Sequence, residues 1–255
     1  MPQPRVLILR APGTNCNEET AHAFTLAGAV CEQVHVLRLL ESPAMLDDYQ
    51  VFCLPGGFSY GDDIAAGRIL GGQVRRQLGD AMQRFRDAGK LVLGVCNGFQ
   101  VLMATGLLGL EDPSGPLATL TRNDSGRFEA RWVRLSVAAG ECVFLRGIEQ
   151  MELPVAHAEG KFVCREGSLP TLGAQAVLRY TTEGGGGTAY PANPNGSADH
   201  IAGVCDPTGR VLGLMPHPER FVDPTQHPQW TRRREGGNGV ADGLKVFQNA
   251  VAHFG

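Results

Sequence analysis

The chain has 255 residues, a formal net charge of −3 at pH 7, and 43% hydrophobic against 19% charged residues. This composition supports a buried core, excludes an intrinsically disordered chain, and lacks the basic surplus typical of nucleic-acid-binding proteins. Seven cysteines without a C-x-x-C pair argue against a disulfide framework and a structural zinc site. No apolar run reaches the length of a membrane span. We expect a cytoplasmic protein with one domain over residues 1–255 and no metal site.

The first half of the chain alternates between short apolar strands and helices. Strands are predicted, in chain order, at residues 5–9, 33–37, 51–54 and 90–95. Helices are predicted at 17–28, 71–88 and 97–105, each following a strand or its loop. Such strand–helix alternation is typical of an α/β fold with a mostly parallel sheet and helices on both of its faces.

The second half contains short strands separated by turn signals, which predicts antiparallel additions to the same sheet. These strands are expected at 118–122, 129–137, 153–155, 174–180, 201–205 and 211–215, and a terminal helix at 240–253. The polar stretch Asp223–Asn238 is predicted to be an exposed loop insertion.

The segment Gly94-Val95-Cys96-Asn97-Gly98 follows a predicted strand and opens a predicted helix. This pattern indicates a nucleophile elbow, because a nucleophile on a tight turn needs small residues two positions to either side. The N-terminus of the following helix favours the Cys96 thiolate, and the Asn97 amide can serve an oxyanion hole. A buried structural cysteine is the alternative, and the two glycines weigh against it.

A cysteine nucleophile needs a base and a group that orients the base. The segment Pro216-His217-Pro218-Glu219 follows a predicted strand, and residues two apart in an extended chain project to the same side. We therefore expect His217 to act as the base and Glu219 to orient it.

A glycine-rich loop, Pro55-Gly56-Gly57, follows the strand at 51–54. Ligands bind at the carboxyl ends of strands in parallel sheets, where this loop and the elbow should meet. The Gly57 amide is the predicted second donor of the oxyanion hole.

Taken together, the three motifs at 55–57, 94–100 and 216–219 resemble those of the class I glutamine amidotransferases. The resemblance implies a flavodoxin-like amidotransferase fold and a Cys96, His217 and Glu219 triad that hydrolyses glutamine through a thioester. It also implies a glutamine pocket formed by the Gly57 and Asn97 amides and by Gln100.

Four further segments are similar to one branch of that family, the glutaminase subunits of phosphoribosylformylglycinamidine synthases. They are residues 54–62, 123–129, 157–162 and 190–197. This resemblance implies a synthetase subunit as partner, with a small bridging subunit as a further partner. It further implies that the partner converts formylglycinamide ribonucleotide to the amidine with ammonia from this chain.

The chain contains no G-x-x-x-x-G-K-[ST] phosphate loop. We therefore expect it to hold no cofactor, with ATP and Mg²⁺ on the synthetase. Two alternatives remain open at this point. One is a free-standing cysteine hydrolase of γ-glutamyl bonds on the same fold, and the other is a non-catalytic flavodoxin-like binding protein.

Overall fold

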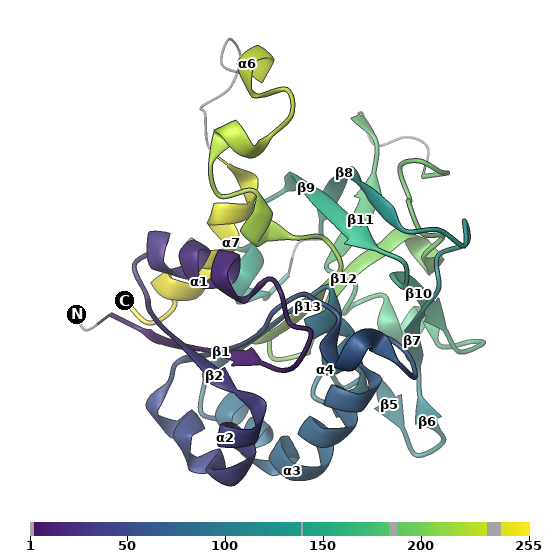
Figure 1. Ribbon diagram of the computed structural model, residues 1–255. Helices are drawn as coiled ribbons and strands as arrows, with labels where there is room; N and C mark the ends of the chain where they lie inside the picture. The colour runs from purple at the N-terminus through teal and green to yellow at the C-terminus, as the bar shows by residue number, and fades with distance from the viewer. Residues whose placement is uncertain (1–2, 139, 184–187, 234–240) are drawn as a thin grey trace.

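The computed structural model describes residues 3–138, 140–183, 188–233 and 241–255. Its main feature is a nine-stranded sheet in the order β2-β1-β3-β4-β13-β12-β11-β8-β9 (Figure 1). The strands are β1 (Arg5–Arg10), β2 (Val30–His35), β3 (Val51–Leu54), β4 (Leu91–Val95), β8 (Glu129–Val137), β9 (Gln150–His157), β11 (Leu178–Thr181), β12 (Ile201–Cys205) and β13 (Val211–Leu214).

The sheet has a parallel half and an antiparallel half. Strands β2, β1, β3, β4 and β13 run parallel to one another, and β12, β11, β8 and β9 continue the sheet in antiparallel pairs. This arrangement confirms the α/β class predicted from the sequence. In register, Leu54 of β3 pairs with Gly94 of β4, and Leu214 of β13 pairs with Val95. The segments that follow these strands therefore emerge side by side at one edge.

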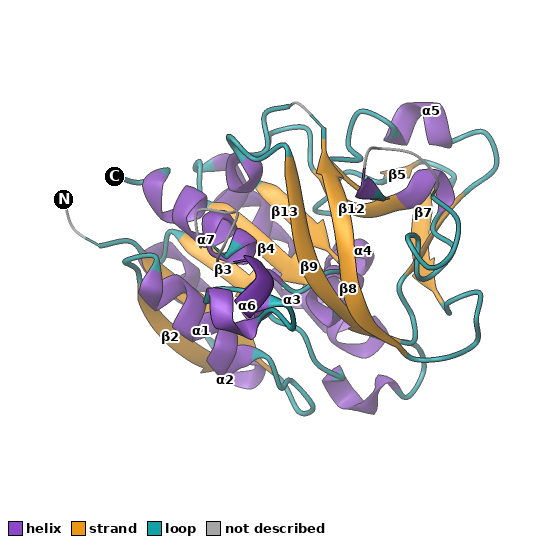
Figure 2. Cartoon of the chain, turned by 90° about the horizontal axis from the view of Figure 1, so that it is seen from above, coloured by secondary structure: helices purple, strands orange, loops and turns teal. Residues whose placement is uncertain are grey.

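Helices cover both faces of the parallel half (Figures 1 and 2). The helices that do so are α1 (Asn17–Leu26), α2 (Val36–Glu41), α3 (Arg68–Asp87), α4 (Asn97–Thr105) and α7 (Asp242–Ala252). Two short helices, α5 (Leu169–Leu172) and α6 (Trp230–Arg233), lie away from this half (Figures 1 and 2). Helices α1 and α7 meet through an edge-to-face contact of Phe24 with Phe247, whose ring centroids lie 4.8 Å apart. Helices α3 and α4 pack closely because Gly71 faces Ala104. Within the described ranges, we find no helix that combines the length and hydropathy needed to cross a bilayer.

Two small antiparallel pairs lie outside the main sheet. They are β5 (Glu111–Asp112) with β6 (Gly115–Pro116), and β7 (Ala118–Thr121) with β10 (Lys161–Cys164). The prediction that residues 118–122 would extend the main sheet is therefore wrong. Strand β10 supplies the partner, and its four residues carry too short a pattern to be recognised as a strand.

The strand predicted at 33–37 begins three residues earlier and ends two residues earlier, because β2 spans Val30–His35 and α2 begins at Val36. His35 is the N-cap of α2, and its Nδ1 accepts a hydrogen bond from the Leu37 amide at 3.3 Å. The apolar run after His35 belongs to the helix, whose Val36 and Leu39 are buried. Apolar runs this short do not separate a strand from a helix.

The structure describes the predicted loop 223–238 as far as residue 233, and residues 223–232 are exposed except for buried His227 and half-buried Trp230. A 3₁₀ turn at Pro224–Gln226 with an Asp223 capping box is followed by α6. His227 is only 2% exposed and packs against the Trp132 ring at 4.4 Å. Its Nε2 also lies 3.4 Å from a carboxylate oxygen of Glu152. His227 therefore anchors an otherwise exposed polar segment to β8 and β9, while α6 projects away from the sheet (Figure 1).

Candidate active site

Cys96 stands on a strained turn between β4 and α4. Its backbone adopts φ 51° and ψ −106°, in the left-handed region that residues with a Cβ avoid. The turn is possible because Gly98 lies against β3: a Cβ on Gly98 would come within 1.8 Å of the Leu54 carbonyl oxygen. The Cys96 amide donates to the Leu214 carbonyl at 2.8 Å, which ties the turn to β13. The predicted elbow therefore has the geometry that its glycines indicated.

His217 and Glu219 follow β13 and point toward each other. His217 Nδ1 lies 2.6 Å from Glu219 Oε1, and the two residues are 2% and 1% exposed. The His217 amide donates to the Pro154 carbonyl of β9 at 2.8 Å, which holds the histidine against the antiparallel half. Burial alone would lower the pKa of His217, but the Glu219 carboxylate and the neighbouring Cys96 raise it well above the usual imidazole value. The structure thus favours an imidazolium between a carboxylate and a thiol.

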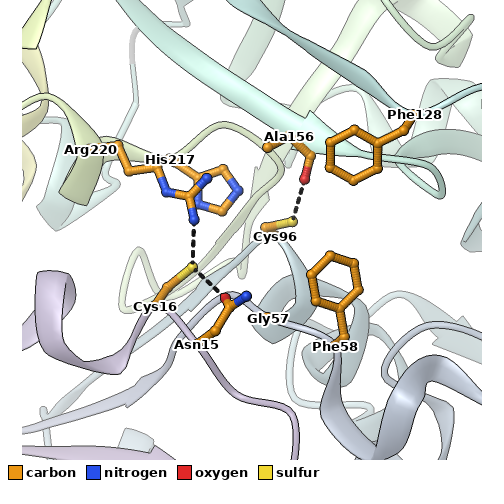
Figure 3. Close-up of a pocket in the computed structure, with 9 residues that line it drawn as sticks. All are labelled: Asn15, Cys16, Gly57, Phe58, Cys96, Phe128, Ala156, His217 and Arg220. Atoms are coloured by element: carbon orange, nitrogen blue, oxygen red, sulfur yellow. Dashed lines mark hydrogen bonds between the residues drawn. The ribbon is translucent and has the colours of Figure 1, made fainter.

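Cys96 and His217 line the same cavity, which measures about 80 Å³ (Figure 3). The lining residues are Asn15, Cys16, Gly57, Phe58, Cys96, Phe128, Ala156, His217 and Arg220. The Cys96 thiol donates to the Ala156 carbonyl at 3.7 Å, while His217 Nε2 is buried without a hydrogen-bond partner among the described residues. A ligand in the cavity would meet a thiol and a free ring nitrogen at once.

Gly57 lies on the opposite side of this cavity, at the end of β3. Its φ of +147° is a backbone conformation that glycine adopts easily and other residues rarely do. A Cβ at this position would also come within 2.8 Å of the Asn15 amide nitrogen. The loop before α1 closes over it, since the Phe58 amide donates to the Gly13 carbonyl at 2.9 Å. Gly57 and the Cys96 turn therefore face one space, as their positions after neighbouring strands predicted.

Asn97 and Gln100 lie behind the elbow and do not appear among the residues that line the cavity. The Asn97 amide group bonds to the Ser59 amide, to Asp62 Oδ1 and to Gln100 Oε1 at 2.9–3.1 Å. Gln100 Nε2 in turn donates to the Glu159 carbonyl. Both side chains are thus engaged in hydrogen bonds outside the cavity, and the oxyanion-hole role of the Asn97 backbone amide stays a prediction.

The segments 123–129, 157–162 and 190–197 come together in one buried polar cluster. Asn123 accepts hydrogen bonds from His157 Nδ1 and from the Gly160 amide, both at 3.1 Å, and donates to the His157 carbonyl at 2.8 Å. Asn195 donates to the Gly160 carbonyl at 2.8 Å, and Ser197 Oγ accepts from the Phe162 amide. Burial, with a smaller contribution from His217, lowers the pKa of His157 to about 4. His157 is therefore a neutral structural residue at the end of β9, beside Ala156.

Sequence reasoning missed three polar residues of the cavity, Asn15, Cys16 and Arg220. Cys16 lies at the N-cap of α1 and is 1% exposed. Arg220 donates from Nη2 to Cys16 Sγ at 3.2 Å and from Nε to Glu19 at 2.8 Å. The order of the strands could have indicated Cys16. It follows β1, a strand parallel to β3 and β4, so it reaches the same edge of the sheet as Gly57 and Cys96.

The fold and site define a class of protein, the glutamine amidotransferases. A glutamine amidotransferase of Thermotoga maritima superposes with a TM-score of 0.56 at 16% identity, covering 100% of this chain and 98% of that one, which shows a common fold. A sequence model of the CobB/CobQ-like glutamine amidotransferase domain matches residues 3–254, and the chain belongs to that family.

Individual relatives indicate which kind of glutamine amidotransferase this chain resembles. The chain is 48% identical over 253 residues to the phosphoribosylformylglycinamidine synthase subunit PurQ of Dehalococcoides mccartyi, covering 98% of each chain. It is 40% identical to the subunit of the same name in Methanococcus maripaludis, covering 98% and 97%. Among solved structures, PurLQS of Thermotoga maritima contains a chain with a TM-score of 0.75 and 32% identity, and both chains are covered completely.

Proposed function

We propose that this chain is the glutamine-hydrolysing subunit of a phosphoribosylformylglycinamidine synthase and works in the cytoplasm as one domain. One observation carries the chemistry: the cavity brings the Cys96 thiol next to His217, whose other ring nitrogen is bonded to the buried Glu219. The matching family model supports glutamine as the substrate, and the named relatives, aligned over 98% of the chain, support the assembly.

In the proposed reaction the Cys96 thiolate attacks the side-chain amide carbon of glutamine. The resulting oxyanion accepts hydrogen bonds from the Gly57 and Asn97 backbone amides. The imidazolium of His217 gives its proton to the leaving nitrogen, so ammonia departs and a γ-glutamyl thioester remains on the sulfur. His217 then takes a proton from water, whose oxygen attacks the thioester, and glutamate is released with the thiolate restored.

Glu219 has an electrostatic part in this scheme. Its carboxylate holds the Nδ1 proton of His217, so that Nε2 is the nitrogen that faces the cavity and exchanges protons with the substrate. Because both groups are buried, water screens the pair little, and the carboxylate stabilises the imidazolium that begins the first half-reaction and is formed again in the second.

The ammonia is used by a partner. We propose that a synthetase subunit binds ATP, Mg²⁺ and formylglycinamide ribonucleotide and forms the amidine, and that a small third subunit bridges the two. The similarity to a chain of the Thermotoga maritima PurLQS structure supports this assembly, and the chain has no phosphate-loop motif of its own.

The experiment measures glutamate release from glutamine by this chain alone and with its synthetase partner. We expect release to rise strongly with the partner and to vanish in Cys96→Ala. Cys164→Ser is the matched control, because Cys164 lies in β10 and does not line the cavity.

The same complex provides a second readout, formation of the amidine from ammonium salts. We expect ammonium to bypass the Cys96→Ala defect, since the synthetase site is intact. Unchanged glutamate release in Cys96→Ala would refute the assigned nucleophile. Full release without any partner would favour the free-standing γ-glutamyl hydrolase instead.

A further inference from the structure

The side chain of Asn97, the residue after the nucleophile, is buried and does not line the cavity. Its Oδ1 accepts a hydrogen bond from the Ser59 amide at 3.1 Å. Its Nδ2 donates to Asp62 Oδ1 at 3.1 Å and to Gln100 Oε1 at 2.9 Å. The proposed hydrolysis uses only the backbone amide of Asn97, so it gives this side chain no part.

These contacts allow one orientation of the Asn97 side-chain amide. Its oxygen faces an N–H group and its nitrogen faces two acceptor oxygens, so each contact pairs a donor with an acceptor. A half-turn of the amide would set its nitrogen against the Ser59 N–H and its oxygen against the Asp62 carboxylate. Both contacts would then be repulsive, and the side chain is therefore held in a single position.

The loop that receives these bonds begins at Gly57, which carries the other expected donor to the oxyanion. On one side the loop is tied to the segment before α1, because the Phe58 amide donates to the Gly13 carbonyl at 2.9 Å. On the other side the bond from Ser59 ties it to Asn97 at the start of α4. The Asn97 side chain thus links the backbone of one expected donor to the backbone of the other.

The same loop contains a strained turn. Tyr60 and Asp62 have φ of 55° and 54°, in the left-handed region that residues with a Cβ seldom adopt. Such residues persist where the surrounding contacts fix them, and they concentrate at functional sites. Asp62 Oδ1 accepts from Asn97 Nδ2 and, at 3.4 Å, from the Gly67 amide. This carboxylate therefore fastens the strained turn to the elbow.

We propose that the Asn97 side chain is a positioning residue that sets the distance between the Gly57 and Asn97 backbone amides, and that Asp62 holds it in the required orientation. The inference rests on the proposed function, in which these two amides form the oxyanion hole. Donors in such a hole are effective when they are fixed beforehand at hydrogen-bond distance from the developing charge. Without the Asn97 side chain the buried Ser59 amide loses its acceptor, so the strained turn relaxes and Gly57 moves with it.

The main test compares Asn97→Ala with the wild type in the complex with the synthetase. A misplacement of about 1 Å can cost about 100-fold in rate, so we expect kcat for glutamate release to fall by about this factor. KM should change by less than about threefold, because the oxyanion develops only in the transition state. Alkylation of Cys96 by iodoacetamide should stay within about twofold, since it uses the same thiol and forms no oxyanion.

The matched control is Asn249→Ala. Asn249 on α7 also bonds to two backbone groups, because its Nδ2 donates to the Phe144 and Arg146 carbonyls at 2.9 and 2.8 Å. It does not line the cavity, so its substitution should leave kcat at the wild-type value.

A second pair of variants acts from the other side of the contact. Asp62→Ala should lower kcat about tenfold, because Asn97 keeps two of its three bonds. Asp62→Asn should restore most of this loss, since its side-chain oxygen can still accept from Asn97 and from the Gly67 amide. Asp62 is only half-buried, so neither change places a strain on the core, and this pair decides the question if Asn97→Ala does not fold.

Three results would overturn the inference. They are a kcat of Asn97→Ala within about threefold of the wild type, Cys96 alkylation that slows as much as kcat, and equal kcat values in the two Asp62 variants. The second result would mean that the elbow itself has collapsed. A wild-type complex that releases no glutamate would refute the proposed function and the inference with it, whereas an active wild type beside an equally active Asn97→Ala would refute the inference alone.

Discussion

Replacing Glu219 by glutamine should slow glutamine hydrolysis by about 10²- to 10⁴-fold while the fold is retained. The substitution keeps the size of the side chain and leaves an amide oxygen that can still accept from His217 Nδ1. It removes only the negative charge, which is 1% exposed and 2.6 Å from a ring that is 2% exposed.

The magnitude follows from this burial. Removing one partner of a buried ion pair costs about 3 to 5 kcal/mol, because the remaining charge is left without compensation. In the proposed reaction His217 carries a positive charge each time it accepts a proton, so the loss of Glu219 raises the activation free energy by this amount. Since about 1.4 kcal/mol corresponds to a tenfold rate, the loss is about 10²- to 10⁴-fold.

Two assays check this prediction. The first measures kcat for glutamate release with the synthetase present, and the second measures the alkylation of Cys96 by iodoacetamide as a function of pH. Glu219 raises the pKa of His217. Its loss disfavours the thiolate–imidazolium pair, so the pH midpoint of alkylation should move upward.

The matched control is Glu152→Gln. Glu152 lies 3.4 Å from His227, another buried histidine, but neither residue lines the cavity. Its substitution should leave kcat within about twofold, since it alters no group at the reacting atoms. An equal loss in Glu152→Gln, or a Glu219→Gln enzyme that keeps a third of the wild-type kcat, would refute the electrostatic reasoning.

Three further predictions concern folding. The pKa of His157 is about 4 in the folded protein, so as the pH falls the unfolded chain is protonated there before the folded protein is. Between pH 7 and pH 5 the free energy of unfolding, measured by urea titration, should therefore fall by about 2 kcal/mol more in the wild type than in His157→Gln. Gly98→Ala should lower the free energy of unfolding by about 1–3 kcal/mol in thermal melts, because its Cβ would clash with the Leu54 carbonyl. Gly72→Ala on α3 is the control: its Cβ would have no atom within 4 Å, so this variant should be neutral or slightly stabilised. Asn123→Ala should cost roughly 3 kcal/mol or more in the same melts, since buried partners on β9 lose their hydrogen bonds. A flat pH response, an equal loss in both glycine variants, or an unchanged Asn123→Ala melt would each contradict the corresponding account.

The sequence predicted the parts of the site whose geometry is set over a few residues. Gly94 and Gly98 indicated a tight turn at Cys96, and the spacing of His217 and Glu219 indicated that they would meet. The fold class was equally accessible, since the alternation of strands and helices in the first half depends on local patterns. The strand ends then place these motifs at one edge of the sheet.

The remaining features depend on contacts between distant segments. Cys16 joins the cavity only because the chain before α1 hydrogen-bonds to the loop after β3. Asn123 becomes a structural centre because the loops at 157–162 and 190–197 fold onto it. His227 is buried although its neighbours in sequence are polar, since Trp132 of β8 covers it. No local pattern carries such information.

The backbone conformation of Cys96 lowers the stability of the fold, although the reaction needs the side chain at this position. A side chain at φ 51° and ψ −106° costs of order 1–3 kcal/mol, a cost that glycine would avoid. A Cys96→Gly chain should therefore be the more stable protein and an inactive one. Any screen that enriches this chain for solubility or heat resistance alone will favour loss of its nucleophile, so thermostable variants need a selection that also demands ammonia.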